Sequence, residues 1–169
     1  ISVYAASKRG GELLGHVYAH LFGINITCLR FFTVYGPWGR PDMALFLFTE
    51  AMLNDKPIEL YNGGDMKRDF TYVDDIVEGF ARALERPMGY EIINLGHGKP
   101  VHLREFVALI EETLGKKASV IEKEMQPGDV SETFADVSKA KEKLGFSAKM
   151  PIEQGVAHFV AWYRDYYKK

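Results

Sequence analysis

A nearly unbroken apolar run at residues 24–32 limits the possible folds of this chain more than any other segment. It reads Ile-Asn-Ile-Thr-Cys-Leu-Arg-Phe-Phe, which is typical of a parallel strand buried on both faces. Before it come a helix-stop residue, Gly23, and an amphipathic helical pattern from about Tyr4 to Phe22. A helix, a short turn and a buried strand in this order predict an α/β fold.

The rest of the chain continues to alternate helical and strand-like segments. Ser2 is expected to cap the first helix and Asp42 the second. Pro151 is expected to start the last helix, because proline suits a first turn. Further strands are predicted at about 58–61, 91–95 and 118–122, and further helices at about 43–54, 74–85, 101–114 and 136–144.

Composition excludes several classes of function. The 169 residues carry a formal net charge of −2 and no basic block, so nucleic-acid binding has no electrostatic support. No apolar run approaches the roughly 18 residues of a membrane span, and no signal-peptide pattern is present. His16 and His20 share a helix face but lack a suitably spaced carboxylate, so no metal site is expected. We therefore expect a cytoplasmic protein without nucleic-acid or membrane partners.

Tyr4 and Lys8 form the first candidate catalytic pair. Their i, i+4 spacing places both side chains on one face of a helix. A lysine ammonium beside a phenol favours the phenolate by charge attraction, so Tyr4 could act as general base toward a sugar hydroxyl. The alternative is that this spacing, common on surface helices, carries no function.

A loop at 33–44 follows the carboxyl end of the buried strand, where open α/β sheets bind ligands. Its glycines and prolines interrupt regular structure. Arg40 could bind a substrate carboxylate through its planar fork of donors, or it could cap the loop. Thr33 could donate a hydrogen bond to a ligand, or its hydroxyl could initiate a turn.

A third candidate group lies between 58 and 72. Arg68 could clamp a diphosphate through bidentate hydrogen bonds; the alternative is a surface ion pair with Asp65 or Asp69. Tyr61 could stack on a nucleobase, or it could belong to the core.

Together and in order, the motifs resemble UDP-glucuronate 4-epimerases, which belong to the extended short-chain dehydrogenase/reductases. The resemblance covers essentially the whole chain, and the run from Thr33 to Ala44 discriminates best. Open alternatives are another nucleotide-sugar epimerase, a 4,6-dehydratase, or a non-catalytic UDP-sugar-binding or assembly module. The matching segments are Tyr4-Ala-Ala-Ser-Lys8, Leu29-Arg-Phe-Phe-Thr-Val-Tyr-Gly-Pro-Trp-Gly-Arg-Pro-Asp-Met-Ala44, Lys67-Arg-Asp-Phe-Thr-Tyr-Val-Asp-Asp75, Gln126-Pro-Gly-Asp129 and Trp162-Tyr-Arg-Asp165.

The resemblance implies an α/β fold in two parts. Residues 1–35 and 73–97 would be the C-terminal part of a doubly wound Rossmann-type sheet, the NAD-binding domain. Residues 36–72 and 98–169 would form a small α/β lobe that binds the nucleotide sugar. The implied activity is that of an NAD-dependent isomerase, which interconverts UDP-glucuronate and UDP-galacturonate through a 4-keto intermediate.

The resemblance also implies residue roles. Tyr4 would take the proton of the sugar 4-hydroxyl and Lys8 would hold the nicotinamide ribose. NAD would be contacted by Tyr4, Lys8, Thr33 and Val34, and the glucuronate carboxylate by Thr33 and Arg40. Leu60 and Tyr61 would contact the uracil, partly through backbone. Arg68 would contact the phosphates, and Asp129 would contact the UDP ribose or order its own loop.

The family's N-terminal half has no counterpart here, including its glycine-rich turn. Because Tyr4 leaves no room for structure before an active site, we expect the chain to be the C-terminal part of something longer. We expect these residues alone to bind NAD poorly and to show no epimerase activity. In full-length relatives the active-site helix lies at a dimer interface. We therefore expect a homodimer, or self-association through the first helix, around orphaned apolar surface.

Overall fold

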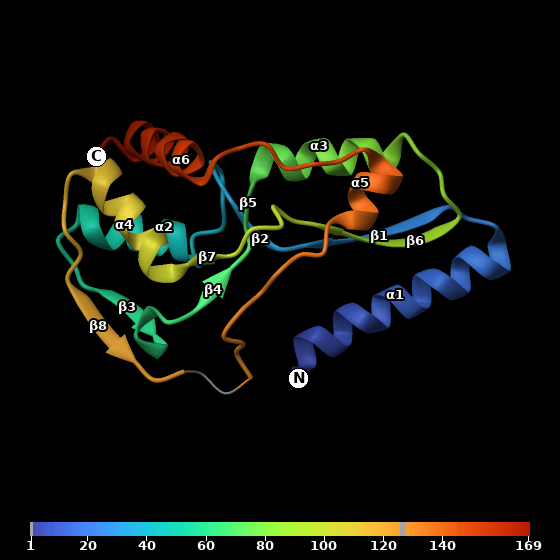
Figure 1. Ribbon diagram of the computed structural model, residues 1–169, viewed down its shortest axis with the longest axis horizontal. Helices are drawn as coiled ribbons and strands as arrows, with labels where there is room; N and C mark the ends of the chain where they lie inside the picture. The colour runs from blue at the N-terminus through green and yellow to red at the C-terminus, as the bar shows by residue number, and fades with distance from the viewer. Residues whose placement is uncertain (1, 126–127) are drawn as a thin grey trace.

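The computed structural model describes residues 2–125 and 128–169 (Figure 1). Gln126 and Pro127, the first half of the family-like segment 126–129, lie outside these ranges. The helices are α1 (Val3–Phe22), α2 (Ala44–Leu53), α3 (Val73–Leu84), α4 (Leu103–Leu114), α5 (Ser138–Leu144) and α6 (Ile152–Tyr167), with a 3₁₀ turn, η1 (Asn62–Gly64). The strands are β1 (Ile26–Phe31), β2 (Thr33–Tyr35), β3 (Ile58–Tyr61), β4 (Lys67–Arg68), β5 (Phe70–Tyr72), β6 (Tyr90–Leu95), β7 (Val101–His102) and β8 (Val120–Lys123).

The apolar run predicted from sequence forms β1, which pairs in parallel with β6. The expected burial on both faces is wrong, because the residues of β1 are half-buried or exposed. The register runs from Ile26 opposite Tyr90 to Phe31 opposite Leu95. Helix α1 lies along one face of this pair, and α3 and α5 lie on the other (Figure 1). Helices on both faces of parallel strands confirm the predicted α/β class.

The second part of the molecule is a smaller α/β lobe. Strands β3 and β8 form a parallel pair, and β4 and β7 form an antiparallel pair. Helices α2, α4 and α6 pack beside these strands (Figure 1). The two parts are joined where β1 continues into β2. The Phe32 N–H donates to the Leu95 carbonyl at 3.1 Å, and the next N–H, of Thr33, donates to the Asp69 carbonyl at 3.0 Å. At Thr33 the chain therefore leaves β6 and joins β5, so this residue begins β2 just after β1 has ended.

The core consists of two buried clusters. The larger lies in the lobe and contains aromatic and aliphatic side chains of α2, α4 and α6, together with Tyr35 and Tyr72. The smaller packs α3 against β6. Ala140, Leu144 and Phe146, which the proposed division places in the lobe, pack in this smaller cluster.

Of the two N-caps predicted for the first two helices, one is confirmed and one is wrong. Ser2 caps α1 as expected, because the Ala5 N–H donates to its Oγ at 3.0 Å. Asp42 does not cap α2. Met43 holds the N-cap position without a side-chain hydrogen bond, because the Asp42 carboxylate accepts hydrogen bonds from Arg40 instead.

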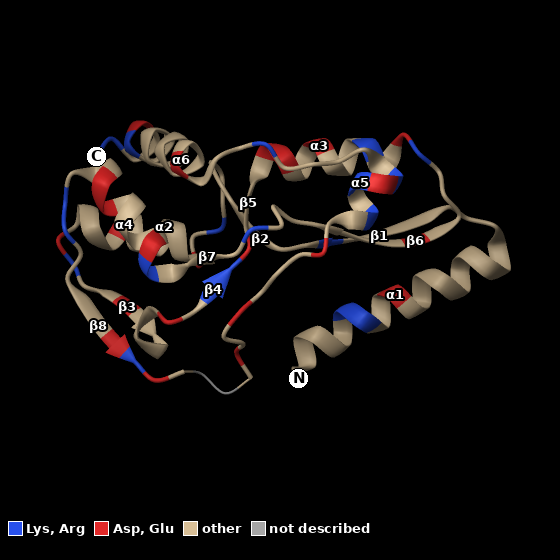
Figure 2. Cartoon of the chain, in the orientation of Figure 1, with Lys and Arg blue, Asp and Glu red and all other residues tan. Residues whose placement is uncertain are grey.

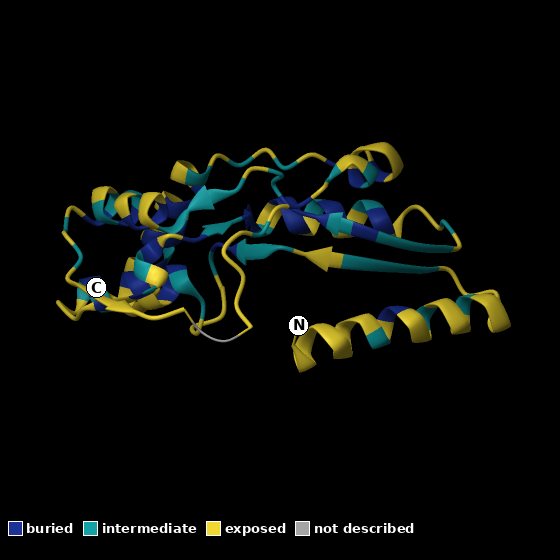
Figure 3. Ribbon diagram, turned by 60° about the horizontal axis from the view of Figure 1, so that its bottom comes forward, coloured by how far each residue is buried: buried dark blue, intermediate teal, exposed yellow. Residues whose placement is uncertain are grey.

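Helix α1 is attached to the sheet largely through one polar side chain. Most of the helix is exposed (Figure 3), and Glu12 is its buried residue. The Glu12 carboxylate accepts from Arg30 Nε at 2.5 Å and Nη2 at 2.8 Å, and also from Arg9. The hydrogen bonds from Arg30 hold the pKa of Glu12 at about 2, below its usual 4.5. The Tyr90 hydroxyl donates to the Glu12 carbonyl at 2.7 Å, which also fastens the helix to β6.

Within the described residues, the helices include none with the length and apolar character needed to span a bilayer.

Candidate functional site

The loop after β2 begins at a position that only glycine can occupy. Gly36 has a φ of 138°, and a Cβ there would lie 2.7 Å from Cγ1 of Val73. A larger residue would have to displace the first turn of α3 as well as adopt a strained backbone. The loop therefore turns sharply away from β2, and its next residues cross toward α6.

Trp38 fastens this loop to the C-terminal helix. Its backbone is left-handed, with a φ of 62°, which is uncommon for a bulky residue. Its ring lies 5.2 Å from that of Trp162 and 5.1 Å from that of Tyr166, measured between centroids. Such aromatic pairs stabilise by about 0.5–1.5 kcal/mol each beyond burial. These contacts place the loop beside α6 two residues before Arg40, although Trp38 is 74% exposed.

Arg40 presents its guanidinium in a geometry suited to a carboxylate. Its Nε donates to Asp42 Oδ1 at 3.0 Å, and its Nη2 donates to Asp42 Oδ2. The paired guanidinium holds the pKa of Asp42 below its usual range. Both side chains are exposed, so the ion pair is weak and replaceable. The bidentate guanidinium of Arg40, which could bind a ligand carboxylate, therefore binds the carboxylate of Asp42 in this structure.

Tyr4 and Lys8 lie on one face of α1, as their spacing predicts. The Lys8 Nζ lies 5.3 Å from the centroid of the Tyr4 ring. Tyr4 lines a cavity of about 750 Å³ together with Thr33, Val34 and Arg40. Lys8 is absent from the wall of this cavity. The phenol and the guanidinium of Arg40 therefore face the same space from two different elements.

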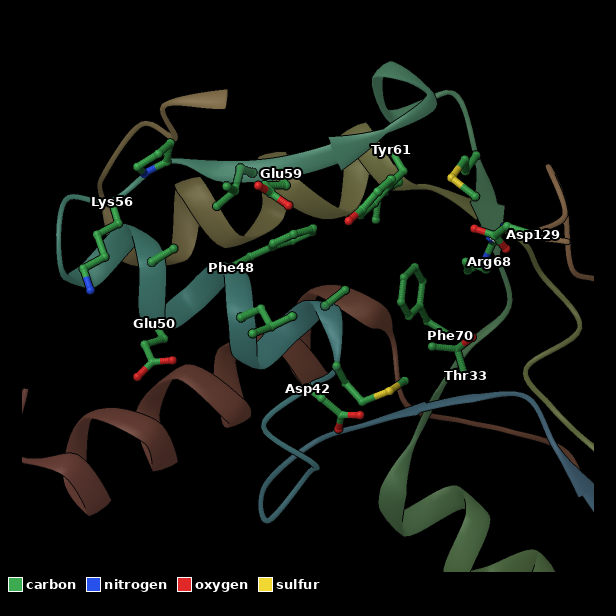
Figure 4. A pocket seen from close by; sticks show the side chains of 18 residues that line it. Thr33, Asp42, Phe48, Glu50, Lys56, Glu59, Tyr61, Arg68, Phe70 and Asp129 are labelled. Carbon is green, nitrogen blue, oxygen red and sulfur yellow. The ribbon is translucent and has the colours of Figure 1, made fainter. Parts of the chain in front are cut away.

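A second cavity, of about 680 Å³, lies within the lobe (Figure 4). Thr33, Tyr61, Arg68 and Asp129 line it together with apolar walls that include Phe48 and Phe70, and further charged residues line it as well: Asp42, Glu50, Lys56 and Glu59. A concave site with apolar walls and convergent polar groups is the usual form of a small-molecule site. Arg68 and Asp129 lie together at one end of it (Figure 4).

Arg68 pairs with neither Asp65 nor Asp69, the two partners considered from sequence. Its Nη2 donates to Asp129 Oδ1 at 2.8 Å, and its Nη1 donates to the Lys67 carbonyl at 2.9 Å. The Arg68 side chain is 17% exposed and that of Asp129 38%. Two residues 61 positions apart in the chain therefore meet, and the guanidinium faces the cavity in a fixed orientation.

Thr33 lines both cavities. It lies where β1 passes into β2, so one strand end connects the space around Arg68 to the space around Tyr4. The structure thus brings seven of the predicted residues to two adjoining cavities: Tyr4, Thr33, Val34, Arg40, Tyr61, Arg68 and Asp129.

Leu60 does not join them through its side chain. It is 3% exposed and belongs to the core of the lobe, because residues alternate between the two faces of β3. Only its backbone could meet a ligand. Sequence reasoning also missed Asp69, a buried carboxylate that it considered only as an ion-pair partner of Arg68. The signal available was its position directly before the apolar strand β5.

Comparison with known proteins identifies the family. Residues 1–96 match the model of the NAD dependent epimerase/dehydratase family. The chain belongs to this family. A UDP-glucuronate 4-epimerase of Thermodesulfobacterium geofontis is 45% identical over 166 residues, covering 98% of this chain and 51% of the relative. The chain spans about half the length of the curated relatives it matches.

Solved structures of the family share this fold. The UDP-glucuronic acid 4-epimerase of Bacillus cereus, in complex with UDP-glucuronic acid and NAD, is 37% identical with a TM-score of 0.92, and the match covers 97% of this chain and 53% of that one. The UDP-glucose 4-epimerase of Thermotoga maritima, solved with UDP-glucose, is 32% identical with a TM-score of 0.93 over 99% of this chain and 55% of that one. Both confirm that this member of the family has the Rossmann-type epimerase fold.

Proposed function

We propose that the chain is the C-terminal portion of an NAD-dependent UDP-glucuronate 4-epimerase. One observation carries the proposal: Thr33 joins a cavity holding Arg68, Asp129 and Tyr61 to a cavity holding Tyr4 and Arg40. A nucleoside diphosphate sugar has the matching order of base, phosphates and sugar. The 45% identity to a curated UDP-glucuronate 4-epimerase supports this choice.

The roles proposed for these residues come from the resemblance to the family, and the places of all but Lys8 in the lining of the two cavities support them. Tyr61 would contact the base, Arg68 the diphosphate and Asp129 the ribose or its own loop. Thr33 and Arg40 would hold the sugar carboxylate, and Tyr4 would take the proton of the 4-hydroxyl as general base. Lys8 would support the phenolate form of Tyr4 by charge and would hold the nicotinamide ribose.

The residues around Tyr4 fit a nicotinamide, because Tyr4, Thr33 and Val34 open onto one cavity of about 750 Å³. When bound, NAD supplies a hydride acceptor for C4 of the sugar and afterwards a hydride donor to either face of the 4-keto sugar. The fork of Arg40 would keep the carboxylate from leaving as carbon dioxide, since a carboxylate held by two hydrogen bonds is poorly oriented for loss. Without the half of the relatives that has no counterpart here, we expect the 169 residues alone to bind NAD poorly and to be inactive.

Arg40 provides the test that separates this function from that of a UDP-glucose 4-epimerase, to which the fold is equally similar. Arg40→Ala should weaken binding of UDP-glucuronate about tenfold, because it removes the bidentate donors to the sugar carboxylate. Binding of UDP-glucose should change little. Calorimetric titration of the purified chain with each nucleotide sugar measures both affinities.

The matched control is Arg86→Ala. Arg86 is also exposed and donates to the Lys143 carbonyl at 3.1 Å, but it lines neither cavity. It should leave both affinities unchanged. Equal losses for the two sugars in the Arg40 variant would instead favour an enzyme acting on neutral hexoses.

We further propose that α1 binds a second copy of the chain. The charged residues of α1 all lie in its first half (Figure 2), and its second half exposes an apolar stripe. Leu14 and Leu21, 63% and 65% exposed, are spaced i, i+7 on that stripe. Contiguous apolar patches of this kind mark interaction surfaces. The two copies would bury these stripes against each other.

The double variant Leu14→Glu, Leu21→Glu should shift the chain from dimer to monomer in light scattering, because two buried charges would face their symmetry mates. Leu84→Glu is the control, since Leu84 is 77% exposed at the end of α3, away from α1. A wild-type chain that is monomeric at high concentration would contradict the proposed dimer.

A further inference from the structure

Asp69 is a completely buried carboxylate that follows Arg68 and takes no part in the roles described above; its exposed fraction is 0%. Its two oxygens accept four hydrogen bonds, three of them from backbone N–H groups of distant segments. A buried carboxylate satisfied in this way is strongly stabilising, because the bonds are charge-assisted. The donors are the N–H groups of His97 at 2.8 Å, Gly98 at 3.0 Å and Ala135 at 3.0 Å, and the hydroxyl of Thr71 at 3.3 Å.

The segments that Asp69 connects approach one another closely. A Cβ at Gly96, in the loop after β6, would lie 2.3 Å from the Cβ of Ala135 and 3.4 Å from either oxygen of Asp69. Real Cβ atoms do not approach another carbon to 2.3 Å, so only glycine allows the loop and the segment before α5 to meet here. Asp69 lies at the centre of this three-way contact.

From Ala135 the chain can be followed back along β4 to Asp129. The Lys67 N–H donates to the Ser131 carbonyl at 2.8 Å, and the Thr133 N–H donates to the Lys67 carbonyl at 3.1 Å. The Asp69 N–H donates to Oγ1 of Thr133 at 3.2 Å. Segment 128–135 is thus held beside β4 by backbone bonds and at its end by the Asp69 carboxylate.

The same segment surrounds the guanidinium of Arg68. Asp129 Oδ1 accepts from Nη2 at 2.8 Å, and the Ser131 carbonyl accepts from Nη1 at 3.4 Å. Asp69 makes no ion pair with Arg68 in the part of the chain that the structure describes. The oxygens of Asp69 bind backbone donors instead, and Asp129 is the carboxylate that pairs with Arg68 at the cavity.

We propose that Asp69 is a positioning residue for the diphosphate site. It holds segment 128–135 against β4 and so sets the orientation of Arg68 and Asp129 toward the phosphates of a nucleoside diphosphate. This role rests on the proposed function, because it requires that the cavity of Arg68 bind such a ligand. Asp69 itself touches no ligand, since it is buried and does not line the cavity.

The test compares UDP with UMP, which differ by one phosphate. In Asp69→Asn, a neutral amide replaces the carboxylate that accepts from the three backbone N–H groups. Its NH₂ group cannot accept these bonds and its oxygen accepts them more weakly, so segment 128–135 is held less firmly against β4. Calorimetry on the whole chain should then show UDP binding weakened at least about tenfold, with a much smaller loss for UMP. The preference for UDP over UMP should approach that of Arg68→Ala.

Asp75→Asn is the matched control. Asp75 is a second buried carboxylate, 6% exposed, which accepts from the N–H groups of Lys149 at 3.0 Å and Met150 at 3.1 Å. Its loss should destabilise the fold by a similar mechanism and leave the preference for UDP over UMP as in the wild type. A loss of preference in both variants, or in neither, would overturn the positioning role.

A milder variant serves if Asp69→Asn does not fold. Thr133→Val removes the acceptor of the Asp69 N–H from a half-buried position and should lower the same preference by a smaller factor. An unchanged preference in this variant contradicts the proposal. Failure of the wild-type chain to bind UDP would refute the proposed function, and the positioning role with it. If the wild type binds UDP and the variants keep its preference for UDP over UMP, the positioning role alone is refuted.

Discussion

Tyr4→Phe is expected to lower turnover of UDP-glucuronate about 10²–10⁴-fold, the usual contribution of a general base. The chain would be assayed in a chimera that joins the N-terminal half of the Thermodesulfobacterium geofontis relative to these 169 residues. Phe keeps the ring and removes the hydroxyl that faces the cavity shared with Thr33 and Arg40. The affinity for UDP-glucuronate should change little, so the loss should appear in kcat.

Tyr18→Phe is the control for this variant. Tyr18 also lies on α1 and is 52% exposed, but it does not line the cavity of Tyr4. It should leave turnover within a factor of about two, as for a surface substitution. If Tyr4→Phe kept more than a tenth of the wild-type kcat, Tyr4 would not be the base.

Glu12→Gln should destabilise the fold by weakening the attachment of α1 to the sheet. It removes the charge that binds Arg30 and Arg9, at a carboxylate 10% exposed. We expect a loss of about 1–3 kcal/mol in the free energy of unfolding at pH 7, because two arginines lose their common partner. Urea unfolding measures the loss, and Glu112→Gln, an exposed glutamate on α4, is the control.

The effect of Glu12 should depend on pH with a defined sign. Folding lowers its pKa from 4.5 to about 2, with the hydrogen bonds from Arg30 as the largest cause. Its contribution is therefore complete above about pH 4.5 and is lost as the pH falls toward 2. The stability gap between wild type and Glu12→Gln should narrow over that interval. A gap of constant size from pH 7 to pH 2.5 would contradict the assignment.

Helix α1 makes this prediction relevant to function. Glu12 lies one turn beyond Lys8 and two beyond Tyr4, on a helix that is otherwise largely exposed. If the pair with Arg30 loosens, both proposed catalytic groups move relative to Thr33. The chimera carrying Glu12→Gln should therefore lose turnover even at temperatures where it stays folded.

Most regular elements followed from local sequence, because helix stops and apolar periods are local signals. Gly23 and Gly145 end helices in the left-handed conformation that their sequence positions predict. The helix expected from Val101 instead begins at Leu103. Val101 and His102 pair with β4, with Val101 opposite Arg68, and such a distant pairing has no local signal.

The site divides in the same way. The shared face of Tyr4 and Lys8 could be predicted, because it depends on residues close in sequence. The pairing of Arg40 with Asp42 was missed although the two are close in sequence, because Asp42 was expected to cap α2. The pairing of Arg68 with Asp129 and the three backbone donors of Asp69 could not be predicted. They join positions 28 to 66 residues apart, which come together only when the lobe folds. The Leu60 side chain lies in the core of the lobe, as the alternation of β3 could have indicated, so only its backbone remains for the expected contact with the base.

The most direct measurement is product analysis of the chimera by NMR after incubation with UDP-glucuronate, with the 169-residue chain alone beside it. We expect the chimera to form UDP-galacturonate without release of carbon dioxide, and the chain alone to form no product. A folded, NAD-bound chimera that leaves UDP-glucuronate unchanged, or that epimerises only UDP-glucose, would contradict the proposed function.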